Sequence, residues 1–307
     1  MVLQKIKKIG KFILNKAKLM PIFEKIKVRY TELLLKFDYS DKTASNLITQ
    51  LIKSKKPIMI CRFGSVEIIA TKDMDKVSNG DKFLINKFKY MQSNAGFFPL
   101  TQNNLKKFHD EMLNDMHEID VLGSWRLEEL YFKNELKNCI KIPLNSLEPF
   151  NEENPWTNEL KNKKVLVIHP FEKTIKLQYN KRTKLFKNLK MLPKFKLKTI
   201  KAIQSIGGTD KFEDWFEALN YMKRKIDLTD FDIAIIGCGA YGLPLAAHIK
   251  RKGKQAIHLG GATQLLFGIK GKRWEETHQK LFNKYWVYPS EEEKPKNYKN
   301  VENGCYW

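Results

Sequence analysis

One stretch of the sequence decides the predicted fold: Phe231-Asp232-Ile233-Ala234-Ile235-Ile236-Gly237-Cys238-Gly239-Ala240-Tyr241-Gly242-Leu243-Pro244-Leu245. A short apolar run ends in three glycines with the spacing Gly-x-Gly-x-x-Gly, and a helical pattern follows directly. This order is typical of the strand, tight turn and helix start of a nucleotide-binding βα unit. Glycine lets the backbone approach a ligand closely, and the new helix presents unpaired N–H groups. The turn therefore predicts a site for an anion such as a phosphate or diphosphate.

The residues that follow argue against a dinucleotide site. Such a site should continue to a second strand ending in Asp or Glu, which would bind the ribose hydroxyls. The next predicted strand, residues 255–259, instead runs into Gly260-Gly261-Ala262-Thr263. The missing acid disfavours an NAD-dependent enzyme. In a further interpretation, the glycines only allow the helix to pack closely on the strand.

Apolar runs alternate with helical patterns from about residue 57 to 280. Strands are predicted at residues 58–61, 119–123, 164–168, 198–202, 231–236 and 255–259, and helices at residues 44–52, 104–116, 179–189 and 212–225. This alternation predicts an open, mainly parallel α/β sheet. Residues 143–154 look like a loop and are a candidate lobe boundary, and Asp210 is a candidate cap for the helix that begins near residue 212.

The end of the first predicted strand carries charged residues. Arg62-Phe63-Gly64-Ser65-Val66-Glu67 follows it directly, at the carboxyl end where α/β proteins place ligands. Arg62 suits a phosphate or a carboxylate. Glu67 suits a metal ion, sugar hydroxyls or the role of a base. An ion pair between Arg62 and Glu67 that merely closes the turn is the alternative.

Other predicted strand ends carry polar or aromatic residues. Ser124 and Trp125 follow the strand at 119–123, and Trp125 could stack on a base or a sugar, although burial is the commoner fate of an aromatic ring. His169 follows the strand at 164–168, where it suits catalysis or contact with a diphosphate, or a purely structural role. Gly260-Gly261 enters another helix and forms a second candidate anion site, with Lys270, Lys272, Arg273 and Trp274 close behind.

The charge of the chain favours anionic partners. Its 307 residues carry a net charge of +22, which suits nucleic acid, a membrane surface or phosphorylated substrates. Nucleic acid is not specifically favoured, because the lysines are spread over helical faces without an Arg-rich tract interleaved with aromatics. The four cysteines are isolated and show no metal-ligand spacing. They fit the reduced thiols of a cytoplasmic protein.

Residues 1–39 are a basic segment that precedes the α/β region. The first 30 residues hold nine Lys and Arg against one Glu, a net charge of +8. Apolar positions recur at helical spacing through residues 2–20 and again through 22–37, which predicts basic amphipathic helices. Residues 1–37 would either contact anionic lipid or pack on their own domain. No apolar run is long enough for a membrane span or fits a signal peptide, so the expected location is the cytoplasm, with the inner face of the cell membrane as the alternative.

Several of these motifs resemble one family. The turn at residues 62–67 resembles the R-(F/Y)-G-D-G-E turn of the GT-D type glycosyltransferases, bacterial Rossmann-like sugar transferases built around an Asp-x-Glu motif. Residues 236–246 and 259–261 resemble the carboxyl half of that family. Residues 258–274, with the closing Gly304-Cys305-Tyr306-Trp307, are similar to products of bacterial surface-polysaccharide genes. The resemblance covers residues 40–307 and implies a single Rossmann-like domain there, with helices on both faces of the sheet.

The resemblance also implies an activity. The protein would transfer a sugar from a nucleotide-sugar donor, often a UDP-sugar, to a glycan or lipid-linked glycan acceptor in surface-polysaccharide synthesis. Glu67 would be the base or a metal ligand, with His169 as the rival base, and Ser124 and Trp125 would contact the acceptor or the sugar. The donor would be bound by Arg62, Gly64, Ser65, Gly237, Gly239, Ala240, Tyr241, Gly242, Gly260, Gly261, Lys270 and Arg273.

The sequence departs from the family motif at one position. Glu67 matches the second acid of Asp-x-Glu, but Ser65 stands in the place of the first. One hydroxyl and one carboxylate make a poorer site for Mg²⁺ or Mn²⁺ than two carboxylates. Without a metal ion, the diphosphate charge must be met by Arg62, the turn N–H groups, and Lys270, Lys272 or Arg273. A non-catalytic module that binds an anionic polymer remains the alternative from another class, and a dinucleotide-dependent enzyme is less favoured.

Overall fold

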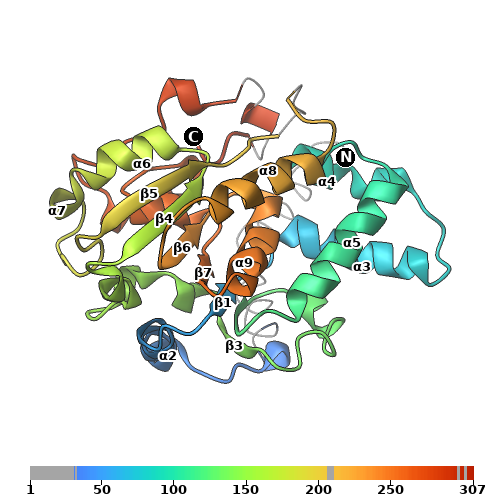
Figure 1. Cartoon of the computed structure of the whole chain (residues 1–307), viewed down its shortest axis with the longest axis horizontal. Coiled ribbons are helices and arrows are strands. Elements are labelled where there is room, and N and C mark those ends of the chain that lie inside the picture. Colours follow the sequence, from blue (N-terminus) through green and yellow to red (C-terminus); the bar gives the residue numbers. More distant parts are fainter. Residues whose placement is uncertain (1–30, 32, 206–210, 296–297, 301–302) are drawn as a thin grey trace, which may run out of the picture.

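The computed structural model describes residues 31, 33–205, 211–295, 298–300 and 303–307, and shows a central sheet with helices on both sides (Figure 1). Within these residues, seven strands form one sheet in the order β3-β2-β1-β7-β6-β4-β5, and every pairing is parallel. The strands are β1 (Ile58–Cys61), β2 (Val121–Ser124), β3 (Ile140–Pro143), β4 (Lys164–His169), β5 (Lys196–Lys201), β6 (Ile233–Ile236) and β7 (Gln255–His258).

Two apolar cores lie on opposite faces of the sheet. Helices α3, α5, α8 and α9 pack on one face, and α2, α6 and α10 pack on the other. The α-helices are α2 (Asp41–Lys53), α3 (Ser65–Ser78), α4 (Lys89–Ser93), α5 (Gln102–Met116), α6 (Glu172–Tyr179), α7 (Arg182–Leu185), α8 (Trp215–Asp227), α9 (Gly242–Arg251) and α10 (Ala262–Leu266).

The inner strands β1 and β6 are apolar throughout, and β4 is apolar from Val165 to Ile168, because both of their faces are covered. In β4, Leu166 and Ile168 join the core beneath α9, while Val165 and Val167 join the core on the other face. Successive side chains of a strand point to opposite faces, so a strand buried on both sides reads as a continuous apolar run. This is why the sequence predicts these strands well.

The path of the chain brings six strand ends together. The chain runs outward from β1 through β2 to β3, crosses to β4 and β5, and returns through β6 to β7, which lies beside β1. Since all strands are parallel, their carboxyl ends lie along one edge of the sheet. In open α/β sheets this edge is where ligands bind, at the point where the strand order reverses.

The predicted α/β fold with its mainly parallel open sheet is confirmed, with two differences. Strand β3 was not predicted, because three of its four residues are only half-buried and the apolar signal is weak. The helix predicted at residues 179–189 is wrong. Helix α6 ends at Tyr179, α7 is a separate short helix, and Leu189 is exposed, so the apolar spacing there does not mark one buried helical face.

Other predictions concern the connections and the first residues. The segment 143–154 lies between β3 and β4 of the same sheet, so the sheet continues across it. Asp210 lies outside the described residues, and the N-cap of α8 is Asp214, whose carboxylate accepts the Glu217 N–H at 2.8 Å. Most of the predicted basic amphipathic segment also lies outside the described residues. Among the described helices, none combines the length and the apolar character that a membrane crossing requires.

Candidate functional site

A cavity of about 480 Å³ opens at the carboxyl edge of the sheet. Residues that end or follow β1, β2, β4, β5, β6 and β7 line it, and only β3 contributes none. Its volume falls within the range of small-molecule sites. The cavity therefore lies where the strand order predicts a ligand.

The turn after β1 places a carboxylate in this cavity. Gly64 is the N-cap of α3, and Glu67 lies in the first turn of that helix. The Glu67 carboxylate folds back over Gly64 so closely that a Cβ there would lie 1.9 Å from Oε2. Burial raises the pKa of Glu67, while its own backbone N–H and the charge of Arg62 oppose that rise. The turn thus holds an acid that is a stronger base than a solvated glutamate.

Arg62 connects three strand ends. Its guanidinium lies 4.8 Å from the centre of the Trp125 ring, after β2. Its Nη1 lies 3.2 Å from where a Cβ would stand on Gly260, after β7, and Gly260 has a φ of +61°. A side chain at Gly260 would be strained and would crowd the guanidinium. Gly260 therefore lines the cavity and also leaves room for the Arg62 guanidinium.

A second arginine lies close to the first. Arg273 also lines the cavity and donates from Nη1 to the Tyr306 hydroxyl at 3.1 Å. Burial lowers the pKa of Arg62, and the charge of Arg273 lowers it further, while Glu67 and Tyr306 raise it. The two like charges affect each other, and Glu67 is the single carboxylate side chain among the described lining residues. The site therefore attracts an anion.

A buried glutamate fixes the turn that places Trp125 in the cavity wall. Glu129 is fully buried, and its carboxylate accepts the Trp125 N–H at 3.0 Å, the Arg126 N–H at 2.9 Å and the Ser124 hydroxyl. The Trp125 indole N–H donates to the Phe63 carbonyl at 3.0 Å. Ser124, which was predicted to contact the sugar or the acceptor, is buried against Glu129 and is not among the residues that line the cavity. Trp125 does line it.

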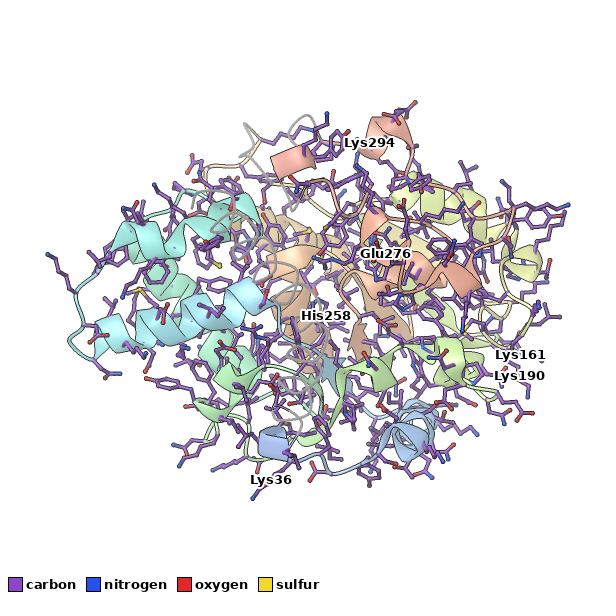
Figure 2. The ribbon with its side chains drawn as sticks, turned by 180° about the vertical axis from the view of Figure 1, so that it is seen from behind. Lys36, Lys161, Lys190, His258, Glu276 and Lys294 are labelled. Atoms are coloured by element: carbon purple, nitrogen blue, oxygen red, sulfur yellow. The ribbon has the colours of Figure 1, made fainter. Side chains whose placement is uncertain are left out.

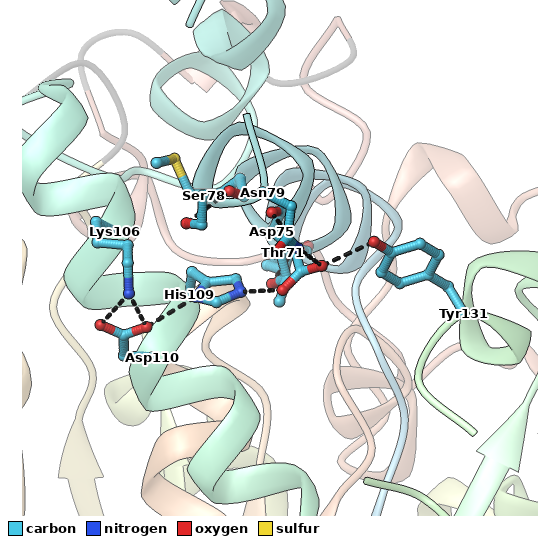
Figure 3. A network of polar contacts seen from close by, with 10 residues as sticks. Thr71, Asp75, Ser78, Asn79, Lys106, His109, Asp110 and Tyr131 are labelled. Atoms are coloured by element: carbon cyan, nitrogen blue, oxygen red, sulfur yellow. Dashed lines mark hydrogen bonds and ion pairs between the residues drawn. The ribbon is translucent and has the colours of Figure 1, made fainter. Parts of the chain in front are cut away.

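A polar network joins the two elements that carry Glu67 and Trp125 (Figure 3). Asp75 of α3 contacts His109 Nε2 of α5 at 3.1 Å and accepts the Tyr131 hydroxyl at 2.7 Å. Tyr131 follows the 3-10 helix η2 (Leu127–Leu130), directly after the Trp125 turn. His109 Nδ1 in turn contacts Asp110 at 2.8 Å. The network fixes α3 relative to the Trp125 wall.

The glycine turn after β6 lines the cavity in part. Gly237, Gly239 and Tyr241 reach it, whereas Ala240 and Gly242, which were also predicted to contact the donor, are not among the lining residues. Gly239 has a φ of +58°, and a Cβ on Gly237 would lie 2.5 Å from the Gly260 carbonyl oxygen. The Tyr241 ring stacks on Trp215 at 4.8 Å, and its hydroxyl lies 2.9 Å from Ser205 Oγ. The residues of this turn are therefore tightly packed against their neighbours.

Gly242 has a packing role that involves a second histidine. A Cβ on Gly242 would lie 2.1 Å from His258 Nε2, so the third glycine allows α9 to approach the end of β7. His258 lies near the middle of the molecule (Figure 2) and lines the cavity. Burial and the charge of Arg62 lower its pKa to about 3. His258 was not among the predicted site residues, although its place at a strand end was a usable signal.

His169 lines the cavity, but its hydrogen bond does not fit the predicted role of a base. The Phe171 N–H donates to His169 Nδ1 at 3.0 Å, so the proton of the neutral ring is on Nε2. Burial lowers the pKa of His169 to about 3. A neutral ring with its proton on Nε2 can donate to a ligand but cannot accept a proton at that atom. His169 is therefore a candidate hydrogen-bond donor.

A comparison with known protein families identifies the family of the chain. A family model described as a GT-D fold-like domain matches residues 40–266, well over half of the chain. The chain belongs to the GT-D-like family. The expected resemblance is thereby confirmed, and so is an α/β fold of the glycosyltransferase-like type.

Two solved structures are similar to this GT-D-like chain over most of its length. One is a selenomethionine-substituted domain of unknown function 1792, with 13% identity, a TM-score of 0.43, and coverage of 83% of this chain and 91% of that chain. The other is described as the domain of unknown function 1792 with a distinct glycosyltransferase fold, with 12% identity, a TM-score of 0.35, and coverage of 82% and 96%. No curated protein matches the chain. The family assignment rests on the domain match.

The GT-D-like cavity does not fit a divalent metal ion. Among the described residues, no group of three or more His, Cys, Asp or Glu side chains converges to hold one. Among the described residues of the lining, Glu67 is the single carboxylate side chain, and it lies close to the positive charge of Arg62. Hard cations prefer several oxygen ligands, and neighbouring cationic side chains oppose them. The residues present suit an anion better than Mg²⁺ or Mn²⁺.

The chain after α10 contributes differently from the prediction. Lys270 and Lys272 do not line the cavity, and the Lys270 ammonium lies 5.6 Å from the Phe282 ring centre. Lys270, which was predicted to contact the donor, therefore lies outside the cavity lining. Gly261 does line the cavity, packed against Tyr306, and Trp307 is buried at the cavity wall. The two terminal aromatics are therefore packed against the rest of the chain.

Proposed function

We propose that this GT-D-like protein is a glycosyltransferase that moves a sugar from a nucleotide-sugar donor to a glycan acceptor. One observation carries the proposal: Arg62 and Arg273 share a cavity at the carboxyl edge of the sheet, and Glu67 is the single carboxylate side chain among its described lining residues. A nucleotide-sugar carries a diphosphate that needs positive charge, and the acceptor hydroxyl needs a base. The cavity offers both.

The donor diphosphate would lie between the two arginines. Guanidinium groups bind phosphate oxygens through charge-assisted, often bidentate hydrogen bonds. The N–H groups at the start of α3, after Gly64, and those of the Gly237 and Gly260 turns could add further donors. Together these groups would meet the diphosphate charge without a metal ion.

Glu67 would act as the general base. The oxygen of the acceptor hydroxyl would attack the anomeric carbon of the donor sugar, and its proton would pass to the Glu67 carboxylate. The bond from the anomeric carbon to the diphosphate oxygen would break, and the nucleoside diphosphate would leave with the electron pair. The arginines would stabilise the negative charge that grows on the leaving group. A base whose pKa is raised towards neutral is suited to this transfer.

The proposal extends to the class of donor, the acceptor and the location. A UDP-type donor and a glycan or lipid-linked glycan of bacterial surface-polysaccharide synthesis are the proposed substrates. Residues 1–37, with their excess of lysine, would bring the enzyme to the inner face of the cell membrane. The family membership supports a sugar donor and acceptor in general.

A thermal-shift panel tests the proposal. The full chain is heated with UDP-, GDP-, CMP- and NAD-type ligands, each with Mn²⁺ and with a chelator. A ligand that binds only the folded state raises the midpoint by mass action. We expect a rise with one sugar nucleotide, of equal size with Mn²⁺ and chelator. A rise with NAD alone, or none with any sugar nucleotide, would overturn the proposal.

A further inference from the structure

More than half of the excess charge lies in one continuous segment. Residues 161–201 hold 14 Lys and Arg against Glu172 alone, a net charge of +13 out of the +22 of the chain. This segment forms β4, α6, α7 and β5, at one side of the molecule (Figure 1). We call it the basic edge. Lys161 and Lys190 lie together at this side (Figure 2), and the backbone of Asn162 bonds to that of Lys194 at 2.9 Å.

Most charges of the basic edge have no acidic partner. Lys164 pairs with Asp230 and Lys176 with Glu172, and Lys173 pairs with Glu292. The other cations of the segment form no ion pair within the described part of the chain. Unpaired charges of one sign repel each other and raise the local potential. This repulsion lowers the stability of the folded protein. A partner with many negative charges would relieve it.

The basic edge follows an open strand that leads to the cavity. Among the strands that the structure describes, β5 is the outermost on this side and pairs only with β4. Lys196, Lys198 and Lys201 are exposed along it, and at about 3.3 Å per residue its six residues span roughly 20 Å. Ile203, Gln204 and Ser205, directly after β5, line the cavity. The row of lysines therefore ends where the proposed transfer takes place.

Protection of the open edge does not account for the whole segment. Lysines on an outer strand prevent strands of other molecules from adding to the sheet. That role explains Lys196 and Lys198. It does not explain Lys181, Lys184 and Lys187, which lie on α7 and its flanking loops and not on an outer strand.

We infer that the basic edge binds an anionic acceptor polymer, a glycan that carries phosphate or carboxylate groups, along β5 with its growing end in the cavity. The inference rests on the proposed function, because it names the class of acceptor for the same site. Binding would come from many lysine point charges spread along the polymer. Affinity would therefore fall steeply with salt, as for other polyanions.

The shape of the basic edge favours a polymer over a flat membrane. Lys196 and Lys198 share the sheet face of Ile200, in the core beneath α8, whereas Thr199 bonds to Glu172 of α6 on the opposite face. Lys201 shares the face of Thr199. Cations on both faces of an edge can surround a chain but cannot all meet one plane. The exposed Leu177 and Leu189 stand singly, as apolar residues of ordinary surfaces do.

Charge reversal on β5 tests the inference. The full chain is compared with a Lys196→Glu, Lys198→Glu, Lys201→Glu variant and with a Lys42→Glu, Lys56→Glu, Lys137→Glu control, which changes the net charge equally at exposed positions away from the basic edge. Labelled poly(glycerol phosphate) and polygalacturonate are the probes, and binding is followed by fluorescence anisotropy from low to high salt. Vesicles with anionic lipid and duplex DNA are titrated in parallel.

We expect the full chain to bind both polymers, the edge variant to bind at least tenfold more weakly, and the control to stay within about threefold. Equal binding by the edge variant, or binding only to vesicles or to DNA, would overturn the inference. A Lys→Gln version of the same three positions replaces the edge variant if melting shows that the latter is unfolded. The nucleotide thermal shift should be unchanged in the edge variant. If the unaltered chain shows no nucleotide thermal shift, the proposed function is contradicted, but the result for polymer binding still stands.

Discussion

The turns after β1 and after β6 lie in the same cavity but contribute in different ways. The β1 turn supplies charged side chains, Arg62 and Glu67, in a setting that shifts the pKa of both. The β6 turn supplies packed backbone: Gly237 fits against the Gly260 carbonyl, and Gly242 fits against His258. The glycine pattern is the more familiar motif, yet the groups suited to chemistry come from the β1 turn. If this division is correct, changes in the first turn should affect catalysis and binding, and changes in the second should affect folding.

The largest expected effect follows from Glu67→Gln. Loss of a general base should lower kcat by roughly 10²–10⁴-fold, while the amide keeps the shape of the turn and nucleotide affinity changes little. In the unaltered enzyme, the raised pKa of Glu67 should place the acid limb of the kcat profile above the usual glutamate value of about 4.3. Activity should fall as the pH drops through that limb, because the base becomes protonated.

Glu276→Gln is the matched control for this change, since Glu276 is exposed. It should leave both kcat and the pH profile unaltered. Full activity of the Glu67→Gln enzyme would show that the general base does not lie in the β1 turn.

The next largest effect concerns the two arginines. Arg62→Gln and Arg273→Gln should each weaken binding of a nucleoside diphosphate by about 10- to 100-fold, since a hydrogen bond to a charged group contributes about 1.5–3 kcal/mol. Titration calorimetry measures the change. Arg224→Gln, at an exposed position on α8, should bind as the unaltered protein does. If the two arginine variants and this control bind equally well, the cavity charge has no role in donor binding.

The β6 turn should respond through stability. Gly237→Ala places a Cβ 2.5 Å from the backbone oxygen of Gly260, which cannot move freely, and overpacking of this kind costs about 1–3 kcal/mol. Gly253→Ala is the comparison, because its φ of +76° is strained but its surroundings are open. Urea unfolding should show a larger loss for Gly237→Ala. A larger loss at Gly253 would mean that the contact with Gly260 relaxes easily.

The smallest effect is expected for Glu129, which positions Trp125 in the cavity wall. Glu129→Ala removes the acceptor of the Trp125 and Arg126 N–H groups, so KM for the nucleotide-sugar should rise by roughly three- to tenfold with little change in kcat. Glu129→Gln keeps an acceptor oxygen for these donors and should restore the KM. Equal kinetics for the alanine and glutamine variants would show that Glu129 only supports folding.

The fold could be predicted because its inner strands are buried on both faces. β1, β6 and residues 165–168 of β4 are continuous apolar runs, and helical patterns separate them. β3 lies at an outer edge and is only partly buried, so its sequence does not stand out. The apolar spacing at 179–189 misled for a related reason: Leu185 is buried but Leu189 faces solvent, and periodicity alone cannot tell the two apart.

The candidate site could be predicted where a residue follows a strand. That rule found Arg62, Glu67, Trp125 and His169, which all line the cavity. It could not tell that Ser124 would turn inwards to Glu129, because that contact depends on the path of the loop. The proton position on His169 likewise depends on the Phe171 N–H, and the sequence holds no sign of that bond.

Titration calorimetry of UDP tests the central claim most directly. UDP is added to the full chain and to an Arg62→Gln, Arg273→Gln double variant, both in the presence of a chelator. The account predicts binding at one site per chain for the unaltered protein and a loss of at least 100-fold in affinity for the double variant. Equal affinity for the two proteins, or binding by the unaltered protein that needs a divalent ion, would contradict the claim that this pair of arginines holds the donor diphosphate.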